Sequence, residues 1–126
     1  MIAVDTSAIM ALLLGEKGAD KISDRLTNNE LCISAGTLSE LLIVAAARGL
    51  GEEAEELISA LGVEVVTVDG AVARQVQQAY VTWGKGGHPA GLNFGDCFAY
   101  ALAKERSIPL LYVGNDFAKT DVRPVC

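Results

Sequence analysis

The sequence predicts an α/β fold in which helices cover both faces of a mainly parallel sheet, giving three layers, α/β/α. Two observations lead to this class. Short apolar segments alternate with helical segments along the whole chain, an order that is typical of parallel sheets. Segments 2–4 and 31–34 are almost wholly apolar, which indicates strands buried on both faces. The chain has 126 residues, which is the length of a single domain, so residues 1–126 are predicted to form one domain.

Five segments are predicted as strands because they are short and rich in apolar or β-branched residues. The first ends at Asp5, and the third, VEVVTV, consists mainly of valine. The fifth, near the C-terminus, carries the weakest pattern. The predicted strands are 1–5, 31–34, 63–68, 109–113 and 122–125.

Six segments are predicted as helices from their composition and from the residues at their ends. Thr6 and Ser7 are suited to cap the first helix, Asp69 the fifth and Asn93 the sixth. Gly49 provides a stop for the third. The glycine-rich stretch between the fifth and sixth helices, GKGGHPAG, is predicted to be a loop. The predicted helices are 8–15, 17–27, 35–48, 52–61, 70–83 and 94–105.

Composition excludes several classes of protein. No apolar run approaches the ~20 residues of a membrane span, and no basic region precedes an apolar stretch at the N-terminus, so we expect a soluble, cytoplasmic protein. Three cysteines without a CxxC pair and a single histidine predict neither a disulfide framework nor a zinc site. A net charge of −6 argues against a broad basic surface for nucleic acid. It suits a basic protein partner.

Four acidic residues from distant segments are predicted to meet at one edge of the sheet. Asp5 follows the first strand, and Asp116 lies just past the strand 109–113. Glu40 is in the first turns of the helix that leaves the second strand. The helix containing Asp96 leads directly into a strand, so it must begin at the carboxyl edge with Asp96 in its first turn. Ligands of open α/β sheets bind at this edge.

Each acid also has a structural interpretation, which stays open from the sequence alone. Asp96 could favour a helix N-terminus, and Asp5 could end a strand through turn formation. Glu40 is harder to explain in this way because Ile43 and Val44, its neighbours along the helix, are apolar. Two carboxylates ~5 Å apart repel by about 3 kcal/mol at an effective dielectric constant of ~20. Oxygen ligands without histidine or cysteine favour Mg²⁺ or Mn²⁺.

The basic and aromatic residues of the second half of the chain are secondary candidates. Tyr80 and Trp83 are expected to be buried rather than to stack on bases, because their helix needs an apolar face. Candidate contacts to phosphate are Arg74, Lys85, Lys119 and Arg123.

The segments VDTSAI, ISAGTLSELLIVAAARG, LNFGDCFAYALAKE and GNDFAKTDV resemble, in order and spacing, the motifs of PIN domains. The resemblance is closest to the VapC-type toxin ribonucleases of bacterial toxin–antitoxin pairs. It implies a doubly wound parallel sheet, endonucleolytic cleavage of RNA with Mg²⁺ or Mn²⁺, a homodimer, and neutralisation by a small basic VapB-type antitoxin. The residues that match the acidic quartet, as catalytic residues and metal ligands, are Asp5, Glu40, Asp96 and Asp116.

Four further residues are candidates for a supporting role. Ser7 and Thr6 match the hydroxyl residues that hold the family's site in place by hydrogen bonds. Asn115 stands where close relatives often have a second aspartate. Asp121 is a candidate outer acid of the cluster, with a turn or a salt bridge as its alternative role.

Two other functions remain as alternatives. A receiver-like signalling module also clusters acids around Mg²⁺ at the rim of an α/β sheet, but it calls for paired acids after the first strand, where this chain has Asp5 followed by Thr6 and Ser7. A catalytically silent PIN domain that acts as a binding scaffold would carry the same residues.

Overall fold

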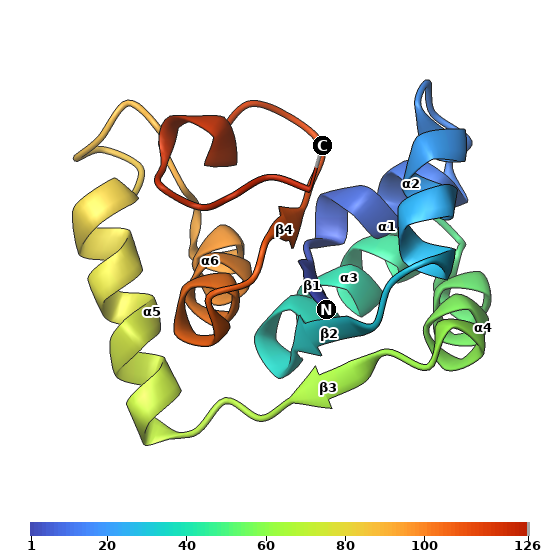
Figure 1. Cartoon of the computed structure of the whole chain (residues 1–126), viewed down its shortest axis with the longest axis horizontal. Coiled ribbons are helices and arrows are strands. Elements are labelled where there is room, and N and C mark those ends of the chain that lie inside the picture. Colours follow the sequence, from blue (N-terminus) through green and yellow to red (C-terminus); the bar gives the residue numbers. More distant parts are fainter. Residues whose placement is uncertain (126) are drawn as a thin grey trace.

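The computed structural model describes residues 1–125, so Cys126 lies outside the described part of the chain. Its centre is a parallel sheet with the strand order β3-β2-β1-β4 (Figure 1). The register places Ile2 beside Leu31 and Ala3 beside Leu110. The strands are β1 (Ile2–Val4), β2 (Leu31–Ser34), β3 (Glu64–Val66) and β4 (Leu110–Leu111).

The helices form a layer on each face of the sheet, which confirms the predicted α/β class. Buried residues of α1 to α4 share one core, whereas those of α5 and α6 share the other. The two groups lie on opposite sides in Figure 1. The helices are α1 (Thr6–Leu13), α2 (Ala19–Thr27), α3 (Ala35–Ala47), α4 (Gly51–Leu61), α5 (Gly70–Trp83) and α6 (Phe94–Arg106), followed by the short 3₁₀ helix η1 (Phe117–Lys119).

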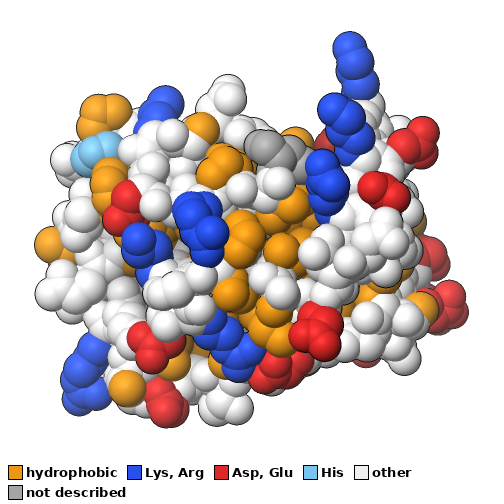
Figure 2. Space-filling view, viewed as in Figure 1, with side chains coloured by type: hydrophobic (Ala, Val, Ile, Leu, Met, Phe, Trp, Pro, Cys, Tyr) orange, Lys and Arg blue, Asp and Glu red, His pale blue; other side chains and the backbone are white. Residues whose placement is uncertain are grey.

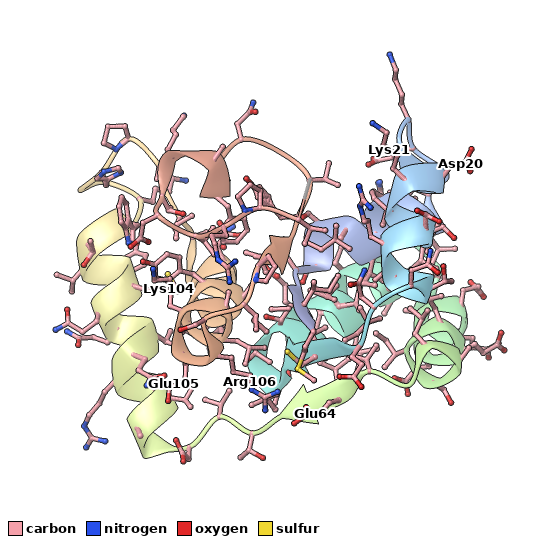
Figure 3. All side chains as sticks on the ribbon, viewed as in Figure 1. Asp20, Lys21, Glu64, Lys104, Glu105 and Arg106 are labelled. Carbon is pink, nitrogen blue, oxygen red and sulfur yellow. The ribbon has the colours of Figure 1, made fainter. Side chains whose placement is uncertain are left out.

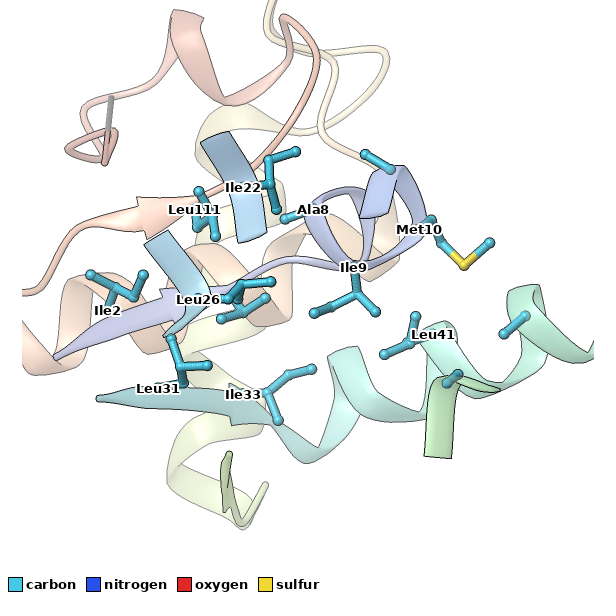
Figure 4. Packing of buried hydrophobic residues seen from close by; sticks show 14 residues of the cluster. Ile2, Ala8, Ile9, Met10, Ile22, Leu26, Leu31, Ile33, Leu41 and Leu111 are labelled. Carbon is cyan, nitrogen blue, oxygen red and sulfur yellow. The ribbon is translucent and has the colours of Figure 1, made fainter. Parts of the chain in front are cut away.

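Alternation along the strands creates these two cores. Ile2 and Val4 of β1 belong to the core under α1 to α4, where Ile2 packs near Leu31 and Leu111 (Figure 4). Ala3, between them, belongs to the opposite core. Successive side chains of a strand point to opposite faces, so a strand that is apolar throughout serves both layers.

The strands differ most from the predicted boundaries. β3 and β4 have three and two residues, and the segment 122–125 forms only an isolated bridge, between Leu110 and Pro124. β3 is short because it is an edge strand with Val65 46% exposed, so its valines do not all reach a core. The helix η1 was not predicted. The first helix is capped by Asp5 rather than by Thr6 and Ser7.

The sheet reverses its winding direction between β1 and β4. From β1 the chain adds β2 and then β3 on one side, and β4 returns to the other side of β1. Such a switch point, at the carboxyl ends of the strands, is where open α/β sheets bind ligands. Among the helices of residues 1–125, none combines the length and apolar character that a membrane crossing requires.

Candidate active site

Asp5 occupies the switch point, directly after β1 and beside the end of β4. Its backbone N–H donates to the carbonyl of Leu111 at 3.0 Å, and its side chain is 3% exposed. Carboxylate oxygen Oδ2 accepts hydrogen bonds from the backbone N–H of Ser7 (3.0 Å) and from its hydroxyl (2.6 Å). Oxygen Oδ1 is buried and has no hydrogen-bond partner among the described residues. Buried polar oxygens normally have a partner, which can be an ordered water molecule or an ion.

Ser7, at the start of α1, links the end of β1 to the segment that follows β4. While its hydroxyl donates to Asp5, the same oxygen accepts a hydrogen bond from the backbone N–H of Val113 at 2.9 Å. Val113 follows β4, so Ser7 fixes the carboxylate of Asp5 relative to the segment that leads to Asp116. This contact supports the predicted positioning role of Ser7.

Thr6 and Gly95 hold the side chain of Glu40 from two sides. The hydroxyl of Thr6 donates to Oε1 of Glu40 at 2.6 Å. Gly95, in the first turn of α6, lies so close to Glu40 that a Cβ atom at this position would clash with the carboxylate. The absence of a side chain at Gly95 therefore lets the carboxylate from α3 rest against the start of α6.

Asp96 forms a capping box with Asn93 at the N-terminus of α6. The backbone N–H of Asn93 donates to Oδ2 of Asp96 at 3.0 Å, and the backbone N–H of Asp96 donates to Oδ1 of Asn93 at 2.9 Å. Burial, followed by the charges of Asp5, Glu40 and Asp116, raises the pKa of Asp96 to about 6. The charges of the other three acids therefore all act on Asp96, which supports the prediction that the four carboxylates lie near one another.

The structure separates Asp116 and Asn115 from Asp121. Asp116 is exposed and precedes η1, and Asn115 is exposed beside it. The carboxylate of Asp121 instead accepts a hydrogen bond from the Tyr100 hydroxyl at 2.5 Å and pairs with Lys104 at 3.1 Å. Asp121 thus has the salt bridge that the sequence left as its alternative role.

Within residues 1–125, no lysine or arginine forms an ion pair with an acid of the rim. The ion pairs within residues 1–125 join Lys104 to Asp121 and Arg106 to Glu64. Desolvation and the charge of Glu40 raise the pKa of Asp5, whereas its hydrogen bonds with Ser7 lower it. An unpaired carboxylate is costly to bury, so the rim as it stands is electrostatically unfavourable.

A hard divalent cation fits this set of donors. All four side chains offer oxygen, which Mg²⁺ and Mn²⁺ prefer, and Oδ1 of Asp5 is a buried oxygen with a vacant lone pair. Within residues 1–125, no three His, Cys, Asp or Glu side chains are already grouped as the ligands of one ion. The fit therefore depends on one or two direct carboxylates with water completing the shell, which is the usual arrangement for Mg²⁺.

Sequence reasoning missed two features of the rim. Asn93 was predicted only as a helix cap, although the spacing of Asn93 and Asp96 is the signature of a capping box. Gly95 carried the signal of a glycine inside a helix, but its partner, Glu40, lies on another helix.

The prediction that Tyr80 is buried was wrong, because Tyr80 is 42% exposed. Trp83 is half-buried.

The stability of the metal-free protein should fall as the pH rises from about 4 to about 6. The pKa of Asp96 is about 6 when folded, against an ordinary value of 3.8, so over this range the folded state binds more protons than the unfolded state. The raised pKa of Asp5 also makes the free energy of unfolding fall as the pH rises. Melting temperatures in EDTA should drop by about 2–4 °C across this range.

The Asp96→Asn variant should show a smaller drop, since the substituted side chain does not titrate. Asp20→Asn, on the exposed surface of α2, should behave like the wild type. The scan begins at pH 4.5, because the lowered pKa of Glu64 gives a stability term that is lost at more acidic pH. A melting temperature that rises from pH 4.5 to 6 and is unaffected by Asp96→Asn would contradict the assignment.

Comparisons with known proteins place the chain in a family. The PIN domain profile matches residues 2–123. Ribonuclease VapC42 of Mycobacterium tuberculosis is 41% identical over 128 residues, which cover 98% of each chain. Among solved structures, VapC20 of Mycobacterium tuberculosis, described as a sarcin–ricin loop cleaving toxin, superposes with a TM-score of 0.78 at 18% identity, covering 99% of this chain and 98% of that one.

A toxin–antitoxin complex from Klebsiella pneumoniae contains a chain that superposes with a TM-score of 0.73 at 16% identity, over 96% of this chain and 93% of that chain. At this level of identity, the solved structures support the fold. The profile and the sequence relative support the family. The chain belongs to the PIN-domain family, as a relative of VapC ribonucleases that matches them over nearly their entire length.

Proposed function

We propose that the protein is a Mg²⁺- or Mn²⁺-dependent endoribonuclease toxin that a VapB-type antitoxin neutralises in the cytoplasm. One observation carries the proposal: Oδ1 of Asp5 is buried and has no hydrogen-bond partner within residues 1–125, at a rim where the charges of Asp5, Glu40 and Asp116 all raise the pKa of Asp96. The names of the relatives, ribonucleases of the VapC type, agree with this chemistry. Family membership removes the receiver-like alternative.

The side chains have distinct roles in the proposed reaction. Asp5, Asp96 and Asp116 would hold the first ion, one or two of them directly and the rest through water, while Glu40 would help to hold a second ion or orient the attacking water. Divalent ions bound by these residues would supply an activated water for in-line attack on a phosphodiester and charge stabilisation for the leaving oxygen. Cleavage would leave a 5′-phosphate and a 3′-hydroxyl. Ser7 and Thr6 keep Asp5 and Glu40 in place through the contacts described above.

Cleavage of a panel of structured RNAs by the purified protein tests the proposal. Products with 5′-phosphate ends should form with Mg²⁺ or Mn²⁺ and disappear with EDTA. Binding of RNA without cleavage under any of these conditions would favour the catalytically silent scaffold. Inhibition by the product of an adjacent reading frame that encodes a small basic protein would support the antitoxin.

The predicted homodimer finds support in an apolar surface beside the rim. Ile43 on α3 is 70% exposed and Phe94 on α6 is 69% exposed, and the ring of Phe94 packs edge-on against Phe98 at 5.0 Å. Ile43 and Val44, the apolar neighbours of Glu40 along α3, therefore lie on the surface. We expect Ile43→Asp to convert a dimer to a monomer in sedimentation experiments. The matched control is Val81→Asp on α5, where a side chain 66% exposed lies in the other helical layer.

A further inference from the structure

A groove outside the acidic rim runs between α5, α6 and the C-terminal segment. It contains a cavity of about 510 Å³, and Figure 3 shows Lys104 and Glu105 on the part of α6 that lies toward α5. Its walls combine aromatic, amide, basic and acidic side chains, and Glu105 is one of the acids. Those that matter here are Arg74, Gln78, Trp83, Tyr100, Lys104 and Asp121.

Hydrogen bonds between the walls fix the shape of this groove. Nε1 of Trp83 donates to the Tyr100 hydroxyl at 2.9 Å, and that hydroxyl donates to Oδ1 of Asp121. Lys104 pairs with the other oxygen of Asp121 at 3.1 Å. Since both oxygens of Asp121 already have partners, this acid presents little repulsion to an anionic ligand. Arg74 contributes a cation whose guanidinium contacts the backbone carbonyl of Gly70.

The groove and the rim share helix α6, which contributes Asp96 to the rim and Tyr100 and Lys104 to the walls of the cavity. Asp96, Tyr100 and Lys104 follow one another at intervals of four residues, so they lie along one side of the helix. Eight residues span about 12 Å at 1.5 Å per residue, the length of a few stacked nucleotides. A second hollow of about 230 Å³ shares Lys104 and Asp121 with the cavity and adds Arg123. A strand bound at the rim can therefore continue into the groove.

The distribution of charged residues along the chain also favours the α5–α6 side as the binding surface for RNA. Residues 1–69 carry four Lys or Arg against twelve Asp or Glu, whereas residues 70–126 carry six against four. Figure 2 shows acidic side chains over α4, whereas over the part formed by α5, α6 and the C-terminal segment it shows several Lys and Arg side chains together with some acidic ones. The α5–α6 side is therefore the more favourable one for a polyanion.

We propose that this groove holds the single-stranded part of the RNA next to the scissile phosphodiester. One base enters the cavity beside Trp83 and Tyr100, and the backbone follows Lys104 and Arg123. The half-buried Trp83 offers the base an aromatic surface, whereas Tyr100, which is 9% exposed, contributes mainly to the shape of the wall. Base–aromatic stacking tolerates any base, and cations contact the phosphates. The inference rests on the proposed ribonuclease function and adds to it the path of the substrate.

Two substitutions on α5 test the groove. Gln78 lines the cavity, whereas its neighbour Gln77 is exposed and lies outside it. Gln78→Trp should occupy part of the cavity where the base is proposed to enter. It should weaken binding of a short, fluorescently labelled single-stranded RNA about tenfold, measured by anisotropy in an Asp5→Asn background. Gln77→Trp should bind like its parent. With Asp5 restored, Gln78→Trp should raise KM for the same RNA and leave kcat unchanged.

A small phosphodiester separates this inference from the proposed function. Bis(p-nitrophenyl) phosphate is too short to reach the groove, so metal-dependent hydrolysis should be equal in wild type, Gln78→Trp and Gln77→Trp. If RNA binding is also equal in the two variants, the groove proposal falls while the nuclease stands. If Gln78→Trp alters sedimentation and leaves RNA binding intact, the groove is a protein interface and the proposal again falls. If the wild type hydrolyses neither RNA nor this small phosphodiester, the proposed nuclease function is refuted instead.

Discussion

Asp5→Asn should abolish RNA cleavage, by about a thousandfold or more, and leave the fold intact. Asp5 supplies the one deeply buried carboxylate of the rim, and several kcal/mol of charge stabilisation depend on a bound divalent ion. The amide retains an oxygen that can accept the two hydrogen bonds from Ser7, so local geometry is preserved. Single-turnover cleavage of a labelled RNA in Mg²⁺ measures the effect.

Thermal unfolding of the same variant gives an independent result. Removing a buried, unpaired charge should keep the metal-free melting temperature unchanged or raise it by about 4 °C for each kcal/mol gained. Mg²⁺ should raise the melting temperature of the wild type by ligand binding, and this increase should be smaller in Asp5→Asn. Asp24→Asn, on the exposed face of α2, is the matched control. Full activity of Asp5→Asn would refute the assignment of the site.

Gly95→Ala should lower the rate of cleavage about tenfold to a hundredfold while leaving stability unchanged or slightly higher. A Cβ at this position would collide with the carboxylate of Glu40, which is the far end of a flexible side chain and can move away. Its movement would break the hydrogen bond from Thr6, and loss of such outer contacts commonly costs this much activity. Alanine is also a better helix former than glycine by about 1 kcal/mol.

Gly51→Ala is a suitable control for this prediction. Gly51 opens α4, and a Cβ there would meet only ordinary contacts with Ala46. The control should gain the helix propensity without losing activity. A parallel loss of activity and stability in Gly95→Ala would point to general misfolding, and unchanged activity would show that the observed position of Glu40 is not needed.

The sequence alone was sufficient for the features that depend on local pattern and on chain direction. Strand β2 has its predicted bounds, because an apolar segment between polar ones has few alternative environments. Asp69 and Asn93 cap their helices as predicted, since capping involves residues only a few positions apart. The convergence of Asp5 and Asp96 followed from parallel strands, whose carboxyl ends share one edge.

Only the tertiary structure decided which side chains from different elements touch. The contact of Gly95 with Glu40, the link from Ser7 to Val113, the exposure of Ile43 and the pairing of Asp121 with Lys104 all depend on how α3, α6 and the C-terminal segment pack. Sequence periodicity reports which face of an element is apolar. It does not report the rotation and offset between two packed elements, which set the contacts between them and create the groove between α5 and α6.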